Sequence, residues 1–165
     1  MTWERILKNC RKYDCYPTIE TFFSTCPPLI RNYLTLQTIP AGQLLIQAGA
    51  PCGTVYILVS GRLQAIEEKA GEIPYSFFDL SPFDIVGDYE LFSEDAESYV
   101  TVRAWEPSAC LTIPPGFYLQ WLSTDSTALF FRTRLLMKKL SLQLNSSRRY
   151  LLMSYGQRCM YVISQ

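Results

Sequence analysis

The chain has 165 residues, a formal net charge of zero and no histidine. This length predicts one domain, or one domain with an appendage, that can bury a core without metals or disulfides. The lack of histidine removes the commonest general base and metal ligand, so we expect neither an enzyme nor a metal site. The amino terminus lacks the apolar core of a signal peptide, and no apolar run is long enough to span a membrane. We therefore expect a cytoplasmic protein with no membrane partner, whose six cysteines are reduced.

Charge is distributed unevenly along the chain. Residues 67–106 carry eleven acidic and two basic side chains, whereas residues 126–165 carry seven basic side chains and no acidic one. A basic carboxyl-terminal segment is compatible with an approach to nucleic acid, and it is also what a solvated helix face looks like.

Residues 1–35 are expected to form an amino-terminal helical segment. Ile6, Leu7 and Cys10 recur at helical spacing, and Thr18 is a candidate cap for a second short helix. Pro28 then favours the start of a further helical turn.

Residues 36–125 are expected to form a β-roll. Short runs rich in β-branched and aromatic residues alternate there with turns that contain glycine or proline. The predicted strands cover residues 44–46, 55–59, 62–65, 75–80, 100–104 and 109–113. The pair Ser60-Gly61 predicts a hairpin between the second and third of these strands. Many short strands at this spacing predict a barrel or jelly roll.

Residues 126–153 predict one long helix. From Ala128 to Met153 the sequence contains neither glycine nor proline, and a helix of that length measures about 39 Å. A small β-roll is too short to cover its apolar stripe, so part of the stripe is expected to pack on a second chain. The expected dimer interface consists of Leu129, Leu136, Leu140 and Leu144. A helix packed wholly on its own domain is the alternative.

The segment from Gly87 to Ala104 contains an unusual combination of features. A glycine opens an acidic turn, and a short apolar helical turn, a polar loop and an alternating strand follow. Such a layout can offer free backbone N–H groups to an anion. Its side chains, however, are acidic where a phosphate would need a positive charge.

Four segments in order resemble the Crp/Fnr regulators and the wider cyclic nucleotide-binding domain family. They are residues 39–49, 55–63, 83–87 and 102–104, and the similarity covers about residues 30–165. The resemblance implies a mainly β fold with helices, in which a double-stranded β-helix, or jelly roll, senses an effector and a long dimerisation helix follows. It also implies that residues 154–165, with Ser154 as cap, begin a helix leading to a DNA-binding winged helix-turn-helix absent from this chain.

The resemblance also identifies a candidate phosphate cassette. In relatives that bind cyclic nucleotides, a Gly-Glu pair begins the cassette, and an arginine near its end neutralises the cyclic phosphate. Here Gly87 is kept, Asp88 replaces the glutamate, Glu90 stands at a usually small position, and Ser98-Tyr99 replace Arg-Ser. A phosphate buried against two acids without a counter-charge is strongly disfavoured, so we expect no response to cAMP.

Two interpretations of this degenerate pocket remain open. In the first, the pocket binds another small-molecule effector, aromatic or apolar. Its lining would then include Gly87, Asp88, Tyr89, Glu90, Leu91, Ser98, Tyr99 and Gln143. In the second, Tyr99 closes the pocket, and the protein is constitutive or controlled by a partner.

The cysteines invite a second comparison. Some Fnr-type relatives hold an iron–sulfur cluster, and Cys10, Cys15, Cys26 and Cys110 are candidates for such a set. The spacings are looser than those of the family, and Cys110 lies one residue out of register, which reverses its face on a strand. We therefore expect packed thiols rather than a cluster.

Taken together, the sequence predicts the effector-sensing and dimerisation part of a Crp/Fnr-type transcription regulator. We expect a homodimer whose cyclic-nucleotide pocket is degenerate. A stand-alone interaction module of the same fold, without DNA binding, is the alternative.

Overall fold

The computed structural model describes residues 2–67, 75–93 and 97–152, of which residues 67, 75–77, 143 and 145–152 are described by their backbone alone. The chain forms two compact units, Met1–Ala128 and Leu129–Gln165. The expected helix after Ser154 lies outside the described residues. No helix in the described ranges is long and apolar enough to cross a membrane.

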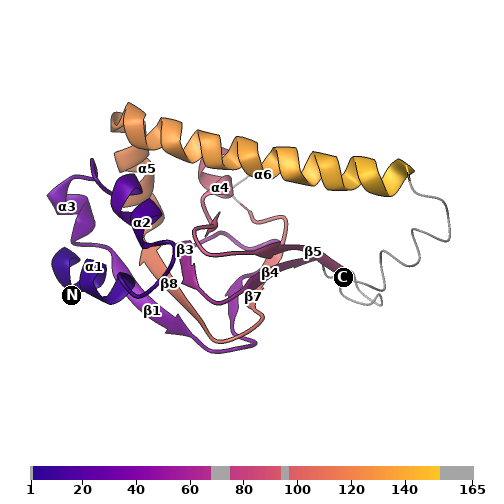
Figure 1. The fold of residues 1–165 in the computed structure, drawn as a ribbon, viewed down its shortest axis with the longest axis horizontal. Coiled ribbons are helices and arrows are strands. Elements are labelled where there is room, and N and C mark those ends of the chain that lie inside the picture. Colours follow the sequence, from indigo (N-terminus) through magenta and orange to yellow (C-terminus); the bar gives the residue numbers. More distant parts are fainter. Residues whose placement is uncertain (1, 68–74, 94–96, 153–165) are drawn as a thin grey trace. The chain divides into compact units, whose positions relative to one another are not determined.

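The first unit contains two antiparallel sheets (Figure 1). Within the described residues, one sheet has the strand order β1-β8-β3-β6 and the other has the order β2-β7-β4-β5. The strands are β1 (Thr35–Ile39), β2 (Leu44–Ile46), β3 (Val55–Ser60), β4 (Leu63–Glu67), β5 (Tyr75–Leu80), β6 (Ile85–Val86), β7 (Thr101–Ala104) and β8 (Ser108–Ile113). Each sheet interleaves early and late strands, as a jelly roll does, so the predicted fold class is confirmed.

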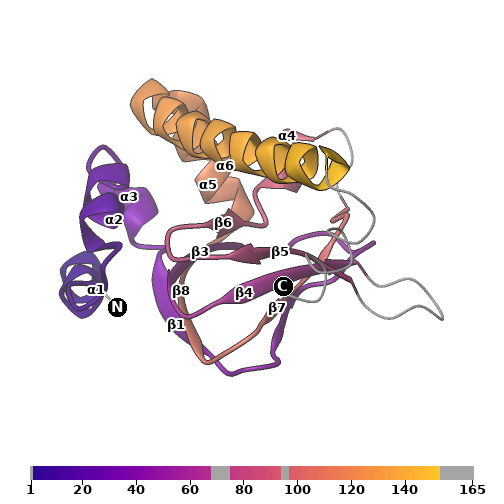
Figure 2. The ribbon, with the colours of Figure 1, turned by 45° about the vertical axis from the view of Figure 1, so that its right-hand side comes forward.

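The described residues also form helices. The helices are α1 (Trp3–Cys10), α2 (Tyr16–Phe22), α3 (Pro28–Arg31), α4 (Tyr89–Phe92), α5 (Pro115–Thr124) and α6 (Ser126–Leu152). Figures 1 and 2 both show α1, α2 and α3 grouped on one side of the β-roll. The long helix α6 begins in the first unit and makes up the described part of the second.

Two apolar clusters hold the first unit together. Residues from both sheets, among them Leu58, Leu63 and Cys110, form a buried core between the sheets. A second cluster joins the helices, because the indole of Trp121 on α5 stacks on Phe23, with ring centroids 5.1 Å apart. The amino-terminal helices and α5 therefore pack as one layer beside the roll.

Two predictions of local structure are wrong. Thr18 does not cap α2, because this helix begins at Tyr16 with Pro17 in its first turn, where a missing N–H costs nothing. Strands β3 and β4 do not form a hairpin, since they lie in different sheets. At Gly61 the chain crosses between the sheets with φ at +87°, and a side chain there would overlap Ser108. The pair Ser60-Gly61 suits a corner between two sheets as well as a hairpin turn, so the sequence alone could not tell the two apart.

Candidate ligand-binding cassette

The candidate cassette, residues 87–93 and 97–99, begins directly after β6. Gly87 has φ at +83°, and a Cβ atom there would lie 2.5 Å from the Thr54 carbonyl oxygen and 2.6 Å from Cys52 Sγ. Only glycine fits both the backbone conformation and this close approach. Gly87 thus allows the start of the cassette to pack closely against Cys52 and Thr54, in the loop before β3.

The far end of the cassette rests on a neighbouring part of the same loop. The Gly49 N–H donates to the Ser98 carbonyl oxygen at 2.8 Å, and the Ser98 N–H donates to the Ala50 carbonyl oxygen at 3.1 Å. Pro51 and Glu97 add a β-bridge. Both ends of the cassette are therefore fixed by residues 49–54, and the sequence alone did not identify that loop as its support.

Ser98 occupies the position where the resemblance calls for arginine. Its side chain is buried, with 4% of the residue exposed. The hydroxyl donates to the Val100 carbonyl oxygen at 3.0 Å. The hydroxyl at the position where the resemblance calls for arginine is thus bonded to a backbone carbonyl oxygen two residues further along the chain.

By the resemblance, Asp88 stands where relatives have a ribose-binding glutamate, and it is also buried, at 3% exposure. Its Oδ2 accepts a hydrogen bond of 3.0 Å from the hydroxyl of Tyr118, a fully buried residue of α5. A buried tyrosine needs a partner for its hydroxyl, and here the partner is 30 residues earlier in the chain. Sequence reasoning missed Tyr118 because nothing local indicates this pairing.

Two tyrosines lie on the surface of the cassette. The rings of Tyr89 and Tyr99 meet edge to face, with centroids 5.8 Å apart. Their exposed fractions are 61% and 59%, so Tyr99 lies at the surface rather than in the core. Aromatic faces in this arrangement can stack on a flat ligand.

Glu90, Cys52 and Leu91 are half-buried. Glu90 Oε2 is enclosed and has no hydrogen-bond partner among the described residues. The Cys52 thiol donates to the Thr54 carbonyl oxygen at 3.1 Å. Burial raises the pKa of this thiol, and the charges of Glu90 and Asp88 raise it further. The Leu91 N–H donates to the Asp88 carbonyl oxygen, and the side chain of Gln143 lies outside the described residues.

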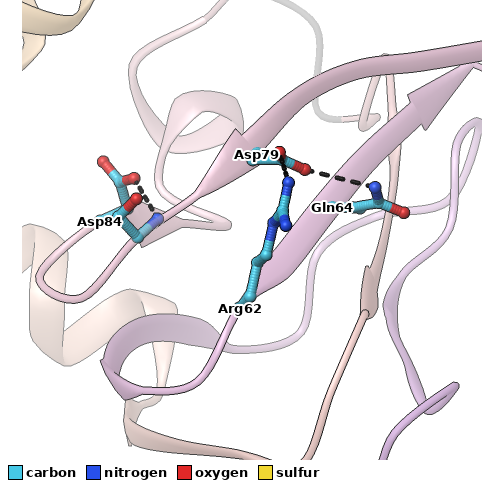
Figure 3. Close-up of polar contacts among 5 residues, drawn as sticks. Arg62, Gln64, Asp79 and Asp84 are labelled. Atoms are coloured by element: carbon cyan, nitrogen blue, oxygen red, sulfur yellow. Dashed lines mark hydrogen bonds and ion pairs between the residues drawn. The ribbon is translucent and has the colours of Figure 1, made fainter. Parts of the chain in front are cut away.

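Arg62 belongs to a segment that resembles the family, and its partner is an aspartate outside residues 87–99 (Figure 3). Its guanidinium pairs with Asp79 of β5, and Gln64 Nε2 donates to the other Asp79 oxygen at 3.3 Å. In the next turn, the Ser81 N–H donates to Asp84 Oδ2 at 2.8 Å. These contacts fix the β4–β5 edge and the turn that leads into β6.

The predicted dimer residues lie on exposed positions of α6. Leu140 and Leu144 are joined there by Phe130 and Met137, which are 65% and 56% exposed. Together with Thr133 they follow one another at spacings of three and four residues, which is the pattern of a coiled-coil seam. The sequence argument followed leucines alone and did not consider Phe130 and Met137.

The cysteines considered as ligands of an iron–sulfur cluster are all buried; they are Cys10, Cys15, Cys26 and Cys110. Burial raises the pKa of Cys10 to about 11 and that of Cys26 and Cys110 to about 12. In the described part of the chain, no three side chains of histidine, cysteine, aspartate or glutamate come together as metal ligands would.

Comparisons with known proteins agree with the fold described above. The family model described as the cyclic nucleotide-binding domain matches residues 36–125. No curated protein sequence matches the chain.

Three solved structures illustrate the similarity of fold. The c-di-GMP-responsive global regulator CLP of Xanthomonas campestris is 21% identical, with a TM-score of 0.69 over 90% of this chain and 70% of that one. A Crp/Fnr-family transcriptional regulator from Eubacterium rectale is 17% identical, with a TM-score of 0.66 over 79% of this chain and 61% of that one. A cAMP-binding acyltransferase from Mycobacterium smegmatis is 27% identical, with a TM-score of 0.52 over 64% of this chain and 34% of that one.

Proposed function

Because the chain belongs to the cyclic nucleotide-binding domain family, we propose that it is the effector-sensing and dimerisation part of a cytoplasmic Crp/Fnr-type transcription regulator whose cassette does not respond to cAMP. The similarity to regulators supports this proposal at the level of fold. DNA would be bound by a domain that is not part of these residues.

The proposal rests on the lack of a positively charged side chain in the cassette. From Gly87 to Val102 the sequence has no lysine or arginine, and the buried Ser98 hydroxyl is bonded to the Val100 carbonyl. A charge-assisted contact to the phosphate is worth about 1.5–3 kcal/mol, or roughly 10- to 100-fold in affinity, and the cassette lacks it. The carboxylates of Asp88 and Glu90 add repulsion, so a cyclic phosphate would be desolvated without compensation.

The remaining features of the cassette favour a different effector. Tyr89 and Tyr99 expose aromatic faces, and Glu90 Oε2 is an enclosed acceptor without a partner among the described residues. An enclosed acceptor is stabilised when a ligand donates to it. The effector that fits is therefore an aromatic compound that carries a hydrogen-bond donor and no phosphate.

The second half of the proposal is a homodimer through α6. One face of α6 exposes a seam of large apolar side chains, which are Leu129, Phe130, Leu136, Met137, Leu140 and Leu144. A second copy of the same seam would bury them in a parallel coiled coil. A change in the geometry of the two helices would then transmit the state of the cassette to DNA-binding heads.

A fusion experiment tests the regulator proposal. The chain is joined to a heterologous DNA-binding head that represses a reporter gene only as a dimer. The proposal predicts repression by the wild-type fusion and its loss in the Leu140→Glu fusion at equal protein level. Absence of repression by a well-folded wild-type fusion would contradict the proposal.

A second candidate is an interaction module of the same fold without DNA binding. The similarity to the acyltransferase favours it, because the matched part is 34% of a chain that is not described as a regulator. A wild-type chain that stays monomeric in the fusion experiment would support this candidate.

A further inference from the structure

The charged side chains of the cassette are all negative. From Gly87 to Val102 the sequence has five acidic side chains and no basic one, and residues 49–54, which support both ends of the cassette, carry no charge. The Cys52 thiol responds to this field, because burial raises its pKa and the charges of Glu90 and Asp88 raise it further. The local potential is therefore negative, so the cassette attracts a cation and repels an anion.

Glu90 holds an enclosed hydrogen-bond acceptor. Its Oε2 has no hydrogen-bond partner among the described residues. Asp88 differs, because its Oδ2 accepts from the Tyr118 hydroxyl at 3.0 Å. A carboxylate oxygen that is cut off from water is stabilised most by a charged donor, since hydrogen bonds between charged groups are stronger than those to neutral groups.

The two exposed tyrosines offer aromatic faces to a cation. Tyr89 directly precedes Glu90 in α4, and its ring meets that of Tyr99 at an interplanar angle of 74°, with centroids 5.8 Å apart. Both residues are more than half exposed. A positive charge placed in the angle between two such rings can lie within about 6 Å of both centroids, the range in which a ring face attracts a cation.

The available ligands favour an organic cation over a metal ion. In the described ranges, no three side chains of histidine, cysteine, aspartate or glutamate come together. Metal ions such as Zn²⁺ and Ca²⁺ take about four to eight ligands, whereas an ammonium group is satisfied by a few acceptors and by ring faces.

We propose that the cassette binds an aromatic compound that carries a protonated primary amine. Its ammonium group donates to Glu90 Oε2, and its charge lies against the rings of Tyr89 and Tyr99. This inference rests on the proposed function, whose aromatic effector it narrows from any hydrogen-bond donor to a cation. The cassette that lacks a counter-charge for a phosphate thus supplies the counter-charge for an amine.

The test is an NMR titration of the full, isotope-labelled chain at pH 7 with two matched probes, 2-phenylethylamine and 2-phenylethanol. Both probes have a phenyl ring and a hydrogen-bond donor on the same short linker, but only the amine is positively charged. The inference predicts that the amine binds roughly tenfold or more tightly than the alcohol, the gain expected from a charged hydrogen bond and a cation–π contact. The amides of Tyr89, Glu90 and Tyr99 should shift and saturate with the amine.

Glu90→Gln and Glu97→Gln are matched variants, because each removes one negative charge from the cassette with little change in size. Glu90 is half-buried, whereas Glu97 is exposed. Glu90→Gln should weaken amine binding roughly tenfold and leave alcohol binding within about twofold of wild type. Glu97→Gln should leave amine binding within about twofold, because water and salt screen an exposed charge. Tyr99→Leu should weaken binding of the amine roughly two- to fivefold more than that of the alcohol.

Three results would overturn the inference. The first is equal affinity for the amine and the alcohol, which leaves a neutral aromatic effector standing. The second is an equal loss of amine binding in Glu90→Gln and Glu97→Gln, which indicates attraction to the acidic surface as a whole. The third is the absence of saturable shifts with the amine, which leaves dimerisation and regulation to the fusion experiment. A negative fusion experiment would in turn leave this inference standing, because the titration uses neither DNA nor a second domain.

Discussion

Gly87→Ala should destabilise the protein much more than Gly49→Ala, although both glycines have similar positive φ angles, +83° and +75°. The left-handed conformation costs a non-glycine residue about 1–2 kcal/mol at either position. At Gly49 an added Cβ meets nothing within 4 Å, whereas at Gly87 it would lie 2.5 Å from the Thr54 carbonyl oxygen and 2.6 Å from Cys52 Sγ. Relief of that overlap should cost about 1–3 kcal/mol more.

The expected losses of unfolding free energy are therefore about 1–2 kcal/mol for Gly49→Ala and about 2–5 kcal/mol for Gly87→Ala. The gain from a less flexible unfolded chain is the same for both variants and cancels in the difference. Urea unfolding followed by tryptophan fluorescence measures both, since Trp121 is fully buried in the first unit. Equal losses would refute the reasoning that the cassette entry is packed against residues 52–54.

Three further predictions concern α6, its cap and the thiols. Leu140→Glu should give a monomer in light scattering, whereas Leu142→Glu, on the opposite helix face, should leave a dimer. If both variants are dimeric, the proposed seam is wrong. Asp125 caps α6, because its Oδ1 accepts from the N–H groups of Thr127 and Ala128 at 3.0 and 3.1 Å. Burial tends to raise the pKa of Asp125, but hydrogen bonds from neighbours including Ala128 hold it below its ordinary 3.8. Asp125→Ala should therefore lower the free energy of unfolding by about 1 kcal/mol at neutral pH. This loss should persist above pH 3.8 and decline as pH falls through the pKa of Asp125 in the folded protein. A loss that grows in acid would contradict the predicted direction. Alkylation of native protein at pH 8 should spare buried Cys110, whose pKa is about 12, and rapid modification there would show that the core opens.

The strands were predictable from sequence because their signals are local. A short apolar run of β-branched and aromatic residues marks residues 55–59 of β3, and the predicted limits of Tyr75–Leu80 agree with those of β5. Partner strands were less predictable, because pairing depends on residues far apart in sequence. Gly61 illustrates this, since the same residue suits a hairpin turn and the corner that the chain forms there.

The limits of the candidate cassette were proposed from sequence, but the hydrogen-bond partners of its side chains could not be predicted. Gly87 could be recognised because its conformational requirement is local. The bond from Tyr118 to Asp88 and the support of Ser98 by Ala50 join distant segments that only the fold brings together. The sequence shows that serine stands at position 98 in place of an arginine. It does not show that the Ser98 hydroxyl donates to the Val100 carbonyl oxygen.

Calorimetric titration with cAMP and, separately, with adenosine tests the central claim most directly, because the two ligands differ in the cyclic phosphate. In a cassette with a counter-charge, the phosphate should tighten binding by roughly 10- to 100-fold. The account predicts that cAMP binds no more tightly than adenosine. A micromolar Kd for cAMP, at least about tenfold below that for adenosine, would contradict it.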